Sequence, residues 1–216
     1  MIFILAQGAG SRWEKNDRKP EQILPANYKQ QIVINGEAII MRTVRMIEEY
    51  TDEPFVVIAE GVMFSHPQLD RLTNKVMTLH YPGNILHGVW QLLQPGSRRN
   101  YTFLLGDVVY SKQALADILS YDEREYTLWG RDFGNLYTGK EAQEIFALTV
   151  AREAEGLLKE QLTTIKETGT KLWHLYHHWL FSGNFETIGD YTDDIDSIEE
   201  YEQFFDALEK AVKEDE

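Results

Sequence analysis

The stretch of sequence that decides the fold is IFILAQGAGSR, residues 2–12. Residues 2–6 form an apolar run of strand length, and glycines at positions 8 and 10 follow it at once. Glycines directly after a strand let the backbone approach a ligand closely, and their N–H groups form a concavity suited to phosphate oxygens. Arg12 adds a guanidinium group for the same oxygens. The stretch therefore predicts a buried first strand that ends in an anion-binding turn.

This turn is not the fingerprint of a dinucleotide-binding protein. Trp13 stands where a third glycine would let a helix pack tightly against the strand, which argues against a dehydrogenase. A glycine turn after a first strand is, taken alone, most often only a turn. Support for a phosphate site must therefore come from elsewhere in the chain.

Strand-length apolar runs alternate with longer segments of helical period along the rest of the sequence. We expect strands at 2–6, 55–59, 76–79, 101–105, 126–130 and 145–150, and helices at about 38–50, 84–93, 112–120, 152–166, 172–180 and 197–212. The strands are mostly apolar on both faces, which is typical of a largely parallel sheet covered by helices on both sides. In such α/β sheets ligands bind beyond the carboxyl ends of the strands.

Composition and charge narrow the class of protein. The chain has 216 residues, 43% of them hydrophobic, and a formal net charge of −14, which predicts one globular domain over residues 1–216. The negative charge disfavours nucleic acid as a partner, and no stretch approaches the roughly 20 apolar residues of a membrane span. The lack of cysteine excludes disulfides, thiolate metal sites and a cysteine nucleophile. We expect a cytoplasmic protein that binds neither membrane nor nucleic acid.

A second candidate site is the Gly-Asp pair at 106–107, directly after the strand at 101–105. A carboxylate at the carboxyl end of a central strand faces the ligand crevice, and Mg²⁺ bound to a triphosphate needs one or two such oxygens. An isolated Gly-Asp is equally often the cap of the following turn. Asp107 is therefore a candidate metal ligand that needs a partner.

The third site, Asp194-Ile195-Asp196, immediately precedes the last helix. Two carboxylates two positions apart in extended chain point the same way. Ser197 and Glu200 form a capping box that fixes how the chain enters the helix. Helix-end electrostatics alone would explain the aspartates, but together with Asp107 and a phosphate-type turn a metal-nucleotide site is the more economical account.

In this order the motifs resemble the nucleotidyltransferase family of sugar-phosphate, choline-phosphate and methylerythritol-phosphate nucleotidylyltransferases, which includes MobA-like NTP transferases. LAQGAGSR resembles its opening signature, with a departure at Gln7, and LLGDVVYS at 104–111 resembles its Gly-Asp strand end. DIDSIEEYE at 194–202 is similar to its closing segment. A further motif of the family, which joins a lysine and a glutamine to paired aliphatics and Arg-Thr, matches Lys29, Gln30, Ile32, Ile34, Gly36, Ile39, Ile40, Arg42 and Thr43.

The resemblance implies a fold and a reaction. The fold is a Rossmann-like three-layer αβα sandwich of the nucleotide-diphospho-sugar transferase type, with a mostly parallel mixed sheet and an acceptor-binding insert at about 126–190. The reaction joins an NTP to a small phosphorylated acceptor with Mg²⁺ as cofactor and releases pyrophosphate. CTP is weakly favoured over UTP, and the acceptor is a sugar phosphate or a phosphocholine-like molecule. A homodimer is one oligomeric form that the sequence leaves open.

The resemblance also implies roles for single residues. Arg12 and Lys29 would act on the phosphates, although Lys19, next to Pro20, is a competing match for the lysine. Asp107 and Asp196 would hold Mg²⁺. The nucleotide would contact Leu5, Ala6, Gln7, Gly8, Ala9, Gly10, Ser11, Arg12, Gly83, Asn84 and Gly88. The acceptor would contact Arg131, Lys140, His174 and His178, although histidines among aromatic residues are more often surface or packing residues.

Two other functions remain open from the sequence. A nucleotide-sugar glycosyltransferase would also use a motif of the form Asp194-Ile195-Asp196, but normally after a strand in the middle of the chain. A catalytically inactive protein that only binds a nucleotide sugar would be expected to lack Lys29 or Asp107, and both are present.

Overall fold

The computed structural model of the chain describes residues 1–6, 29–59, 72, 74–79, 84–94, 96–97, 99–121, 125–178 and 181–215. The glycine-rich turn, Lys19 and Gly83 lie outside these residues. Their predicted roles therefore stay predictions.

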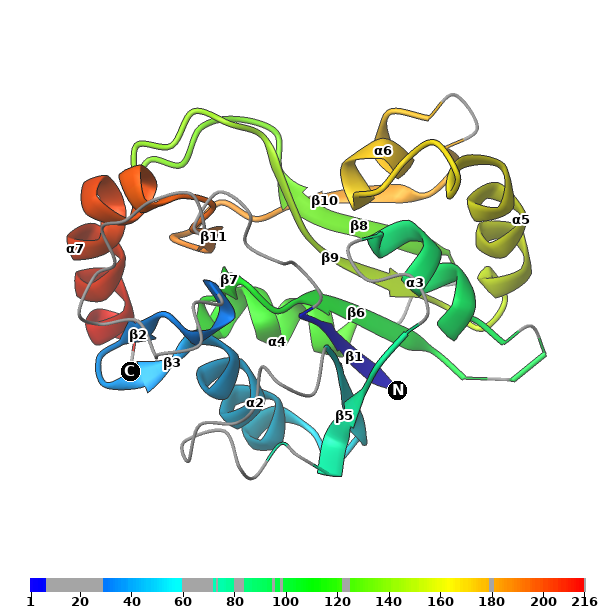
Figure 1. The fold of residues 1–216 in the computed structure, drawn as a ribbon, viewed down its shortest axis with the longest axis horizontal. Helices are drawn as coiled ribbons and strands as arrows, with labels where there is room; N and C mark the ends of the chain where they lie inside the picture. Colours follow the sequence, from blue (N-terminus) through cyan, green and yellow to red (C-terminus); the bar gives the residue numbers. More distant parts are fainter. Residues whose placement is uncertain are drawn as a thin grey trace.

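A seven-stranded mixed sheet forms the centre of the molecule, in the order β10-β8-β9-β6-β1-β4-β5 (Figure 1). Within the described residues β9 alone runs opposite to its neighbours, and the other strand pairs of this sheet are parallel. The strands are β1 (Ile2–Leu5), β4 (Phe55–Ile58), β5 (Val76–Met77), β6 (Tyr101–Leu105), β8 (Tyr126–Arg131), β9 (Glu144–Val150) and β10 (Asn184–Thr187). The expected mostly parallel mixed sheet is confirmed.

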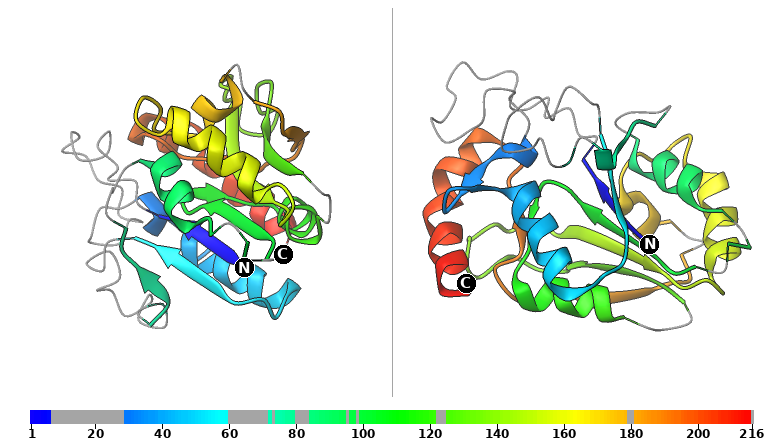
Figure 2. Two further views of the ribbon diagram at one scale, coloured as in Figure 1. Left: turned by 90° about the vertical axis from the view of Figure 1, so that its right-hand side faces the viewer. Right: turned by 90° about the horizontal axis from the view of Figure 1, so that it is seen from below.

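Helices cover both faces of the sheet, as the alternation of apolar side chains in β1 requires (Figures 1 and 2). Ile2 and Ile4 face the cluster that includes α2 (Ile39–Tyr50) and α4 (Lys112–Ser120). Phe3 and Leu5 face the opposite cluster, which includes α3 (Ile85–Leu92), α5 (Glu155–Ile165) and α6 (Leu172–Tyr176). This arrangement is the predicted three-layer αβα sandwich.

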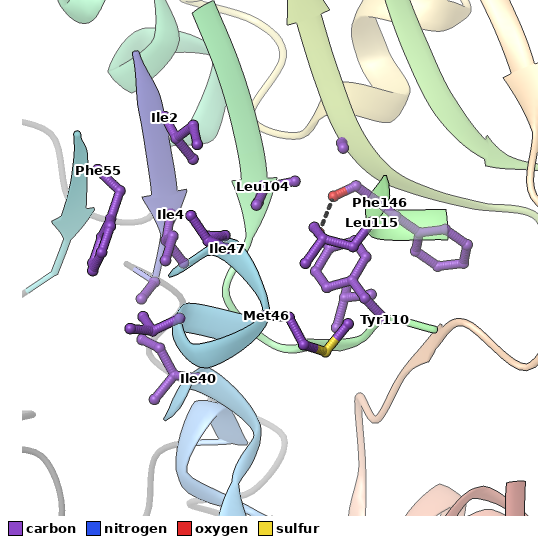
Figure 3. Close-up of a cluster of buried hydrophobic side chains, with 14 of the residues drawn as sticks. Ile2, Ile4, Ile40, Met46, Ile47, Phe55, Leu104, Tyr110, Leu115 and Phe146 are labelled. Atoms are coloured by element: carbon purple, nitrogen blue, oxygen red, sulfur yellow. Dashed lines mark hydrogen bonds between the residues drawn. The ribbon is translucent and has the colours of Figure 1, made fainter. Parts of the chain in front are cut away.

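The core between the sheet and α2 is close-packed (Figure 3). Ile4 and Ile47 are fully buried there, and each such side chain stabilises the fold by roughly 1.5–3 kcal/mol. Within this cluster the hydroxyl of Tyr110 donates a hydrogen bond to the carbonyl of Phe146 at 2.7 Å (Figure 3). The buried hydroxyl of this core is thus paired with a backbone carbonyl.

A smaller apolar cluster at one end of the molecule holds the last helix. The hairpin of β2 (Val33–Ile34) and β3 (Glu37–Ala38) packs with α7 (Ile198–Asp215) in a third apolar cluster. β7 (Val108–Val109) pairs antiparallel with β11 (Asp193–Asp194) beyond the end of β6 (Figure 1). This short pairing joins the two acidic motifs, which lie far apart in the sequence.

Several element predictions need correction. β10, β7 and β11 were not expected, because segments of two to four residues are too short to carry a readable period. α5 begins at Glu155 rather than at 152, and α6 ends at Tyr176 rather than at 180. Within the described residues no helix combines the length and the apolarity needed to cross a membrane.

Candidate active site

Four separate segments meet at the carboxyl ends of β1 and β6. β1 contributes Leu5, β6 contributes Leu105, and the loop after β6 contributes Asp107. The 3-10 helix η1 (Lys29–Gln31) and the link between β11 and α7 complete one side of a pocket. The pocket is also lined by residues of three further segments: Ile85, Glu144, Ile145, Thr170, Lys171, Leu172 and Trp173. The site thus lies where α/β sheets bind ligands.

Lys29 joins the two aspartates that the sequence singled out. Its Nζ atom lies 2.6 Å from Asp196 Oδ1 and also forms an ion pair with Asp107 Oδ2. The three side chains are between 13% and 15% exposed, so water screens them little. Burial lowers the pKa of the Lys29 ammonium, but Asp107 and Asp196 outweigh it and hold the pKa above its ordinary value. Lys29 therefore stays charged.

Asp194 adds a third carboxylate to this pair. One oxygen from each of Asp107, Asp194 and Asp196 lies within 4.8 Å of the others, which is the one such acidic group in the described part of the chain. Both aspartates of the third motif therefore point to the same place, as predicted. Two or three carboxylate oxygens at this separation suit a divalent cation such as Mg²⁺, with water in the other positions.

Lys140 is a second buried lysine that pairs with the carboxylates of this site. Its ammonium pairs with Asp194, lies 3.3 Å from both Glu144 Oε1 and Glu200 Oε2, and is 6% exposed. Burial raises the pKa of Asp194 well above its ordinary value, and the neighbouring Glu144 raises it further against the effect of Lys140. Lys140 is thus a counter-ion of these carboxylates, and its predicted contact with the acceptor stays a prediction.

Arg131, a predicted acceptor contact, forms a buried ion pair in the structure. Its Nη2 atom lies 3.0 Å from Asp193 Oδ1, and both side chains are 1% exposed. Asn135 and Thr138 donate to the other oxygen of Asp193 at 3.1 and 2.7 Å. The guanidinium is therefore enclosed and bonded, and the predicted contact of Arg131 with an acceptor phosphate stays a prediction. Arg131 holds the backbone next to Asp194 in place.

The entry into α7 fixes the backbone of Asp196. The N–H of Glu200 donates to Ser197 Oγ at 3.2 Å, as expected for a capping box. The carboxylate of Glu200 accepts from the N–H of Asp196 at 2.9 Å. The predicted cap is present, with its reciprocal bond one residue earlier than in the standard pattern.

The turn that carries Asp107 is equally constrained. A Cβ on Gly106 would lie 2.9 Å from the Cβ of Ala6, so glycine lets the end of β6 approach β1. The N–H of Leu105 donates to the hydroxyl of Tyr110 at 3.0 Å, which folds the chain after Asp107 back onto the strand. Asp107 is thus presented by a rigid turn.

The histidines do not form the predicted pair on one helix. His174 Nδ1 accepts from the N–H groups of Thr170 and Lys171 at 3.2 and 3.1 Å, and so stabilises the start of α6. His178 lies beyond the end of α6. Within the described residues neither histidine belongs to a group that could hold a metal ion. His174 instead orients the backbone that forms the pocket wall.

Of the predicted nucleotide contacts, Asn84 and Gly88 lie at the start of α3 and inside it. Asn84 accepts from the N–H of His87 at 2.9 Å and donates to the carbonyl of Lys166 at 2.9 Å, so both ends of its amide serve structure. Gly88 is buried inside α3. From this segment Ile85 reaches the pocket. Asn84 and Gly88 are therefore placed as supports of the pocket wall rather than as part of its lining.

Sequence reasoning missed three parts of the site. It assigned metal binding to Asp107 and Asp196 but not to Asp194, although the spacing of the two aspartates in the third motif was the available signal. Glu144 and residues 170–172 lie in the expected insert at about 126–190 but were not singled out within it, because only tertiary packing brings them to the pocket. The expected meeting of Asp107 and Asp196 is present in the structure.

No protein-family model and no curated protein sequence matches the chain. Several solved structures, in contrast, are similar to it in fold. A nucleotidyl transferase from Methanothermobacter thermautotroptrophicus has a TM-score of 0.65 and 13% identity, with 97% of each chain covered. The inositol-1-phosphate CTP transferase from T. maritima has a TM-score of 0.61 and 14% identity over 99% of this chain and 96% of that one. The CTP:phosphocholine cytidylyltransferase from Streptococcus pneumoniae has a TM-score of 0.55 and 12% identity, with 96% and 98% covered.

These similarities extend over almost the whole chain and include the sheet and the helices on both of its faces. The chain therefore has the fold of these nucleotidyl transferases, as the motifs predicted.

Proposed function

We propose that the protein is a Mg²⁺-dependent nucleotidylyltransferase, which transfers a nucleoside monophosphate from an NTP to a small phosphorylated acceptor. The observation that carries this proposal is the contact of Lys29 with both Asp107 and Asp196 at the ends of β1 and β6. A cation and a pair of carboxylates at this place suit a metal-triphosphate substrate. The fold supports the same conclusion.

The charges of the site fit a divalent cation. Acidic side chains outnumber basic ones around the aspartates: Asp107, Asp193, Asp194, Asp196, Glu144 and Glu200 lie near Lys29, Lys140 and Arg131. Asp107 and Asp196, with Asp194 beside them, would hold Mg²⁺. When bound, Mg²⁺ would neutralise the charge of the triphosphate and orient its α-phosphate.

The residues of the chain then supply positioning and charge. In the proposed reaction an acceptor phosphate oxygen forms a bond to the α-phosphorus, and the bond from that phosphorus to the bridging oxygen breaks, with its electrons leaving on pyrophosphate. Lys29 would neutralise the charge between the donor and acceptor phosphates, and Arg12 and the glycine turn would hold the outer phosphates. No side-chain nucleophile is needed.

CTP is the proposed nucleotide, and two of the similar structures carry names of CTP-using enzymes. For the acceptor we propose a sugar phosphate or a phosphocholine-like molecule bound between the aspartates and residues 170–173. Those residues belong to the proposed insert at about 126–190, and they line the same pocket as the carboxylates.

A pyrophosphate-release screen tests this proposal. The four NTPs are combined with Mg²⁺ and a panel of hexose 1-phosphates, inositol 1-phosphate and phosphocholine. We expect pyrophosphate from one NTP with one class of acceptor, and none without the acceptor. Release of a nucleoside diphosphate from a nucleotide sugar would instead identify a glycosyltransferase. Binding of a nucleotide sugar with no turnover in either assay would identify an inactive binder.

A further inference from the structure

Lys29 occupies the space that the proposed function assigns to the metal ion. Its Nζ atom bonds to Asp196 Oδ1 at 2.6 Å and pairs with Asp107 Oδ2, and oxygens of these aspartates and Asp194 lie within 4.8 Å of one another. Mg²⁺ approaches its oxygen ligands to about 2.0–2.1 Å. An ammonium group and a divalent cation cannot both lie between the same two carboxylates, because they overlap and repel. The ammonium must therefore leave before the metal binds both aspartates.

The two lysines of the site differ in their freedom to move. Lys140 is 6% exposed and is held by carboxylates on three elements. Lys29 lines the pocket and is 13% exposed, so its flexible side chain has open space into which it can turn. Lys140 is thus a fixed counter-ion, and Lys29 is an exchangeable one.

Turning away from two carboxylates is unfavourable unless another anion receives the ammonium group. A triphosphate in the same pocket offers such an anion, because its oxygens accept charge-assisted hydrogen bonds from lysine. The same triphosphate brings the metal ion that takes over the aspartates. Binding of the two must then be cooperative, and the cooperativity is reciprocal.

We propose, building on the function proposed above, that Lys29 and the divalent cation are alternative counter-ions of Asp107 and Asp196, and that a polyphosphate drives their exchange. The protein alone binds the free metal ion weakly, and metal and polyphosphate bind tightly together. Lys29 thereby couples the metal site to the arrival of the nucleotide.

Equilibrium dialysis with Mn²⁺ tests the exchange without turnover, since Mn²⁺ prefers the same oxygen ligands. Wild-type protein and Lys29→Met are dialysed with Mn²⁺ alone and with Mn²⁺ plus inorganic tripolyphosphate. Lys29→Met should bind Mn²⁺ alone on the order of tenfold more tightly than wild type, because the competing charge is gone. Tripolyphosphate should increase the Mn²⁺ affinity of wild type by a similar factor, and that of the variant much less.

Lys171→Met is the matched control. Lys171 lines the same pocket but forms no ion pair within the described part of the chain, so its removal deletes the same charge without freeing a carboxylate. We expect its Mn²⁺ affinity to stay within about threefold of wild type. Lys29→Arg keeps the competing charge and should bind Mn²⁺ as weakly as wild type. Circular dichroism confirms that each variant is folded.

Unchanged Mn²⁺ affinity in folded Lys29→Met would overturn the exchange, as would tight binding of Mn²⁺ to wild type without tripolyphosphate. If Lys29→Met does not fold, the proposed exchange is tested by the increase in Mn²⁺ affinity that tripolyphosphate causes in wild type and in Lys29→Arg. Failure of the pyrophosphate screen with the exchange intact would reject the proposed reaction alone. Pyrophosphate release without the exchange would reject the coupling alone.

Discussion

Arg131 and Asp193 form an ion pair that is almost closed to solvent, with 3.0 Å between Nη2 and Oδ1 and 1% exposure of each side chain. Asp193 directly precedes Asp194 in the chain. Asn135 and Thr138 donate hydrogen bonds to the other carboxylate oxygen of Asp193. Breaking a buried pair leaves one charge without compensation, which costs more than the pair itself contributes.

We therefore predict that Asp193→Ala lowers the free energy of unfolding by roughly 3–5 kcal/mol. Urea unfolding followed by circular dichroism measures it. The control is Glu153→Ala, because Glu153 pairs with Arg152 at 2.6 Å on the surface, and its loss should cost about 1 kcal/mol or less. Equal losses in the two variants would contradict the structural role of Asp193.

Asp107 and Asp196 should be required for turnover and not for folding. Asp107→Asn and Asp196→Asn each remove a charge from a cluster with excess carboxylates, so the fold should tolerate the change. We expect the rate of pyrophosphate release to fall by at least roughly 10²–10³-fold. The check combines kcat with the melting temperature. Near-normal turnover in either folded variant would exclude its proposed part in holding Mg²⁺.

Gly106→Ala should disturb the turn that carries Asp107. The added Cβ would lie 2.9 Å from the Cβ of Ala6, so β1 and β6 must shift at the site, at a cost of roughly 1–3 kcal/mol. Gly156→Ala is the control, because its added Cβ would meet no atom within 4 Å apart from those of its chain neighbours and of the backbone of its own helix, α5. This second variant should unfold at the same or a higher urea concentration than wild type.

His87 should make the protein less stable in mild acid. Burial lowers the pKa of His87 below 6.5, and the nearby Lys166 lowers it further. The unfolded chain therefore binds more protons than the folded one, so stability is complete above about pH 6.5 and decreases as the pH falls through the folded pKa. Urea unfolding between about pH 5 and 7.5 should show a smaller acid loss for His87→Gln than for wild type. If the free energy of unfolding falls equally with pH in both proteins, His87 is not the cause of the acid loss.

Local patterns in the sequence were sufficient for the main elements. Apolar runs gave β1, β6 and the helices of both outer layers, and the Ser197–Glu200 pattern gave the start of α7. Asp107 and Asp196 were identifiable because each follows or precedes a well-marked element. These features depend on neighbours within a few positions, and such neighbours are visible in sequence.

Contacts between distant segments were decided by the tertiary structure alone. The pairing of β7 with β11 places Asp194 beside Asp107, and two polar residues give no period from which to predict it. Arg131 and Lys140 look like free surface cations in sequence, but the fold encloses both among carboxylates. Whether a charge binds a ligand or another side chain depends on burial and on partners far along the chain, and only packing sets these.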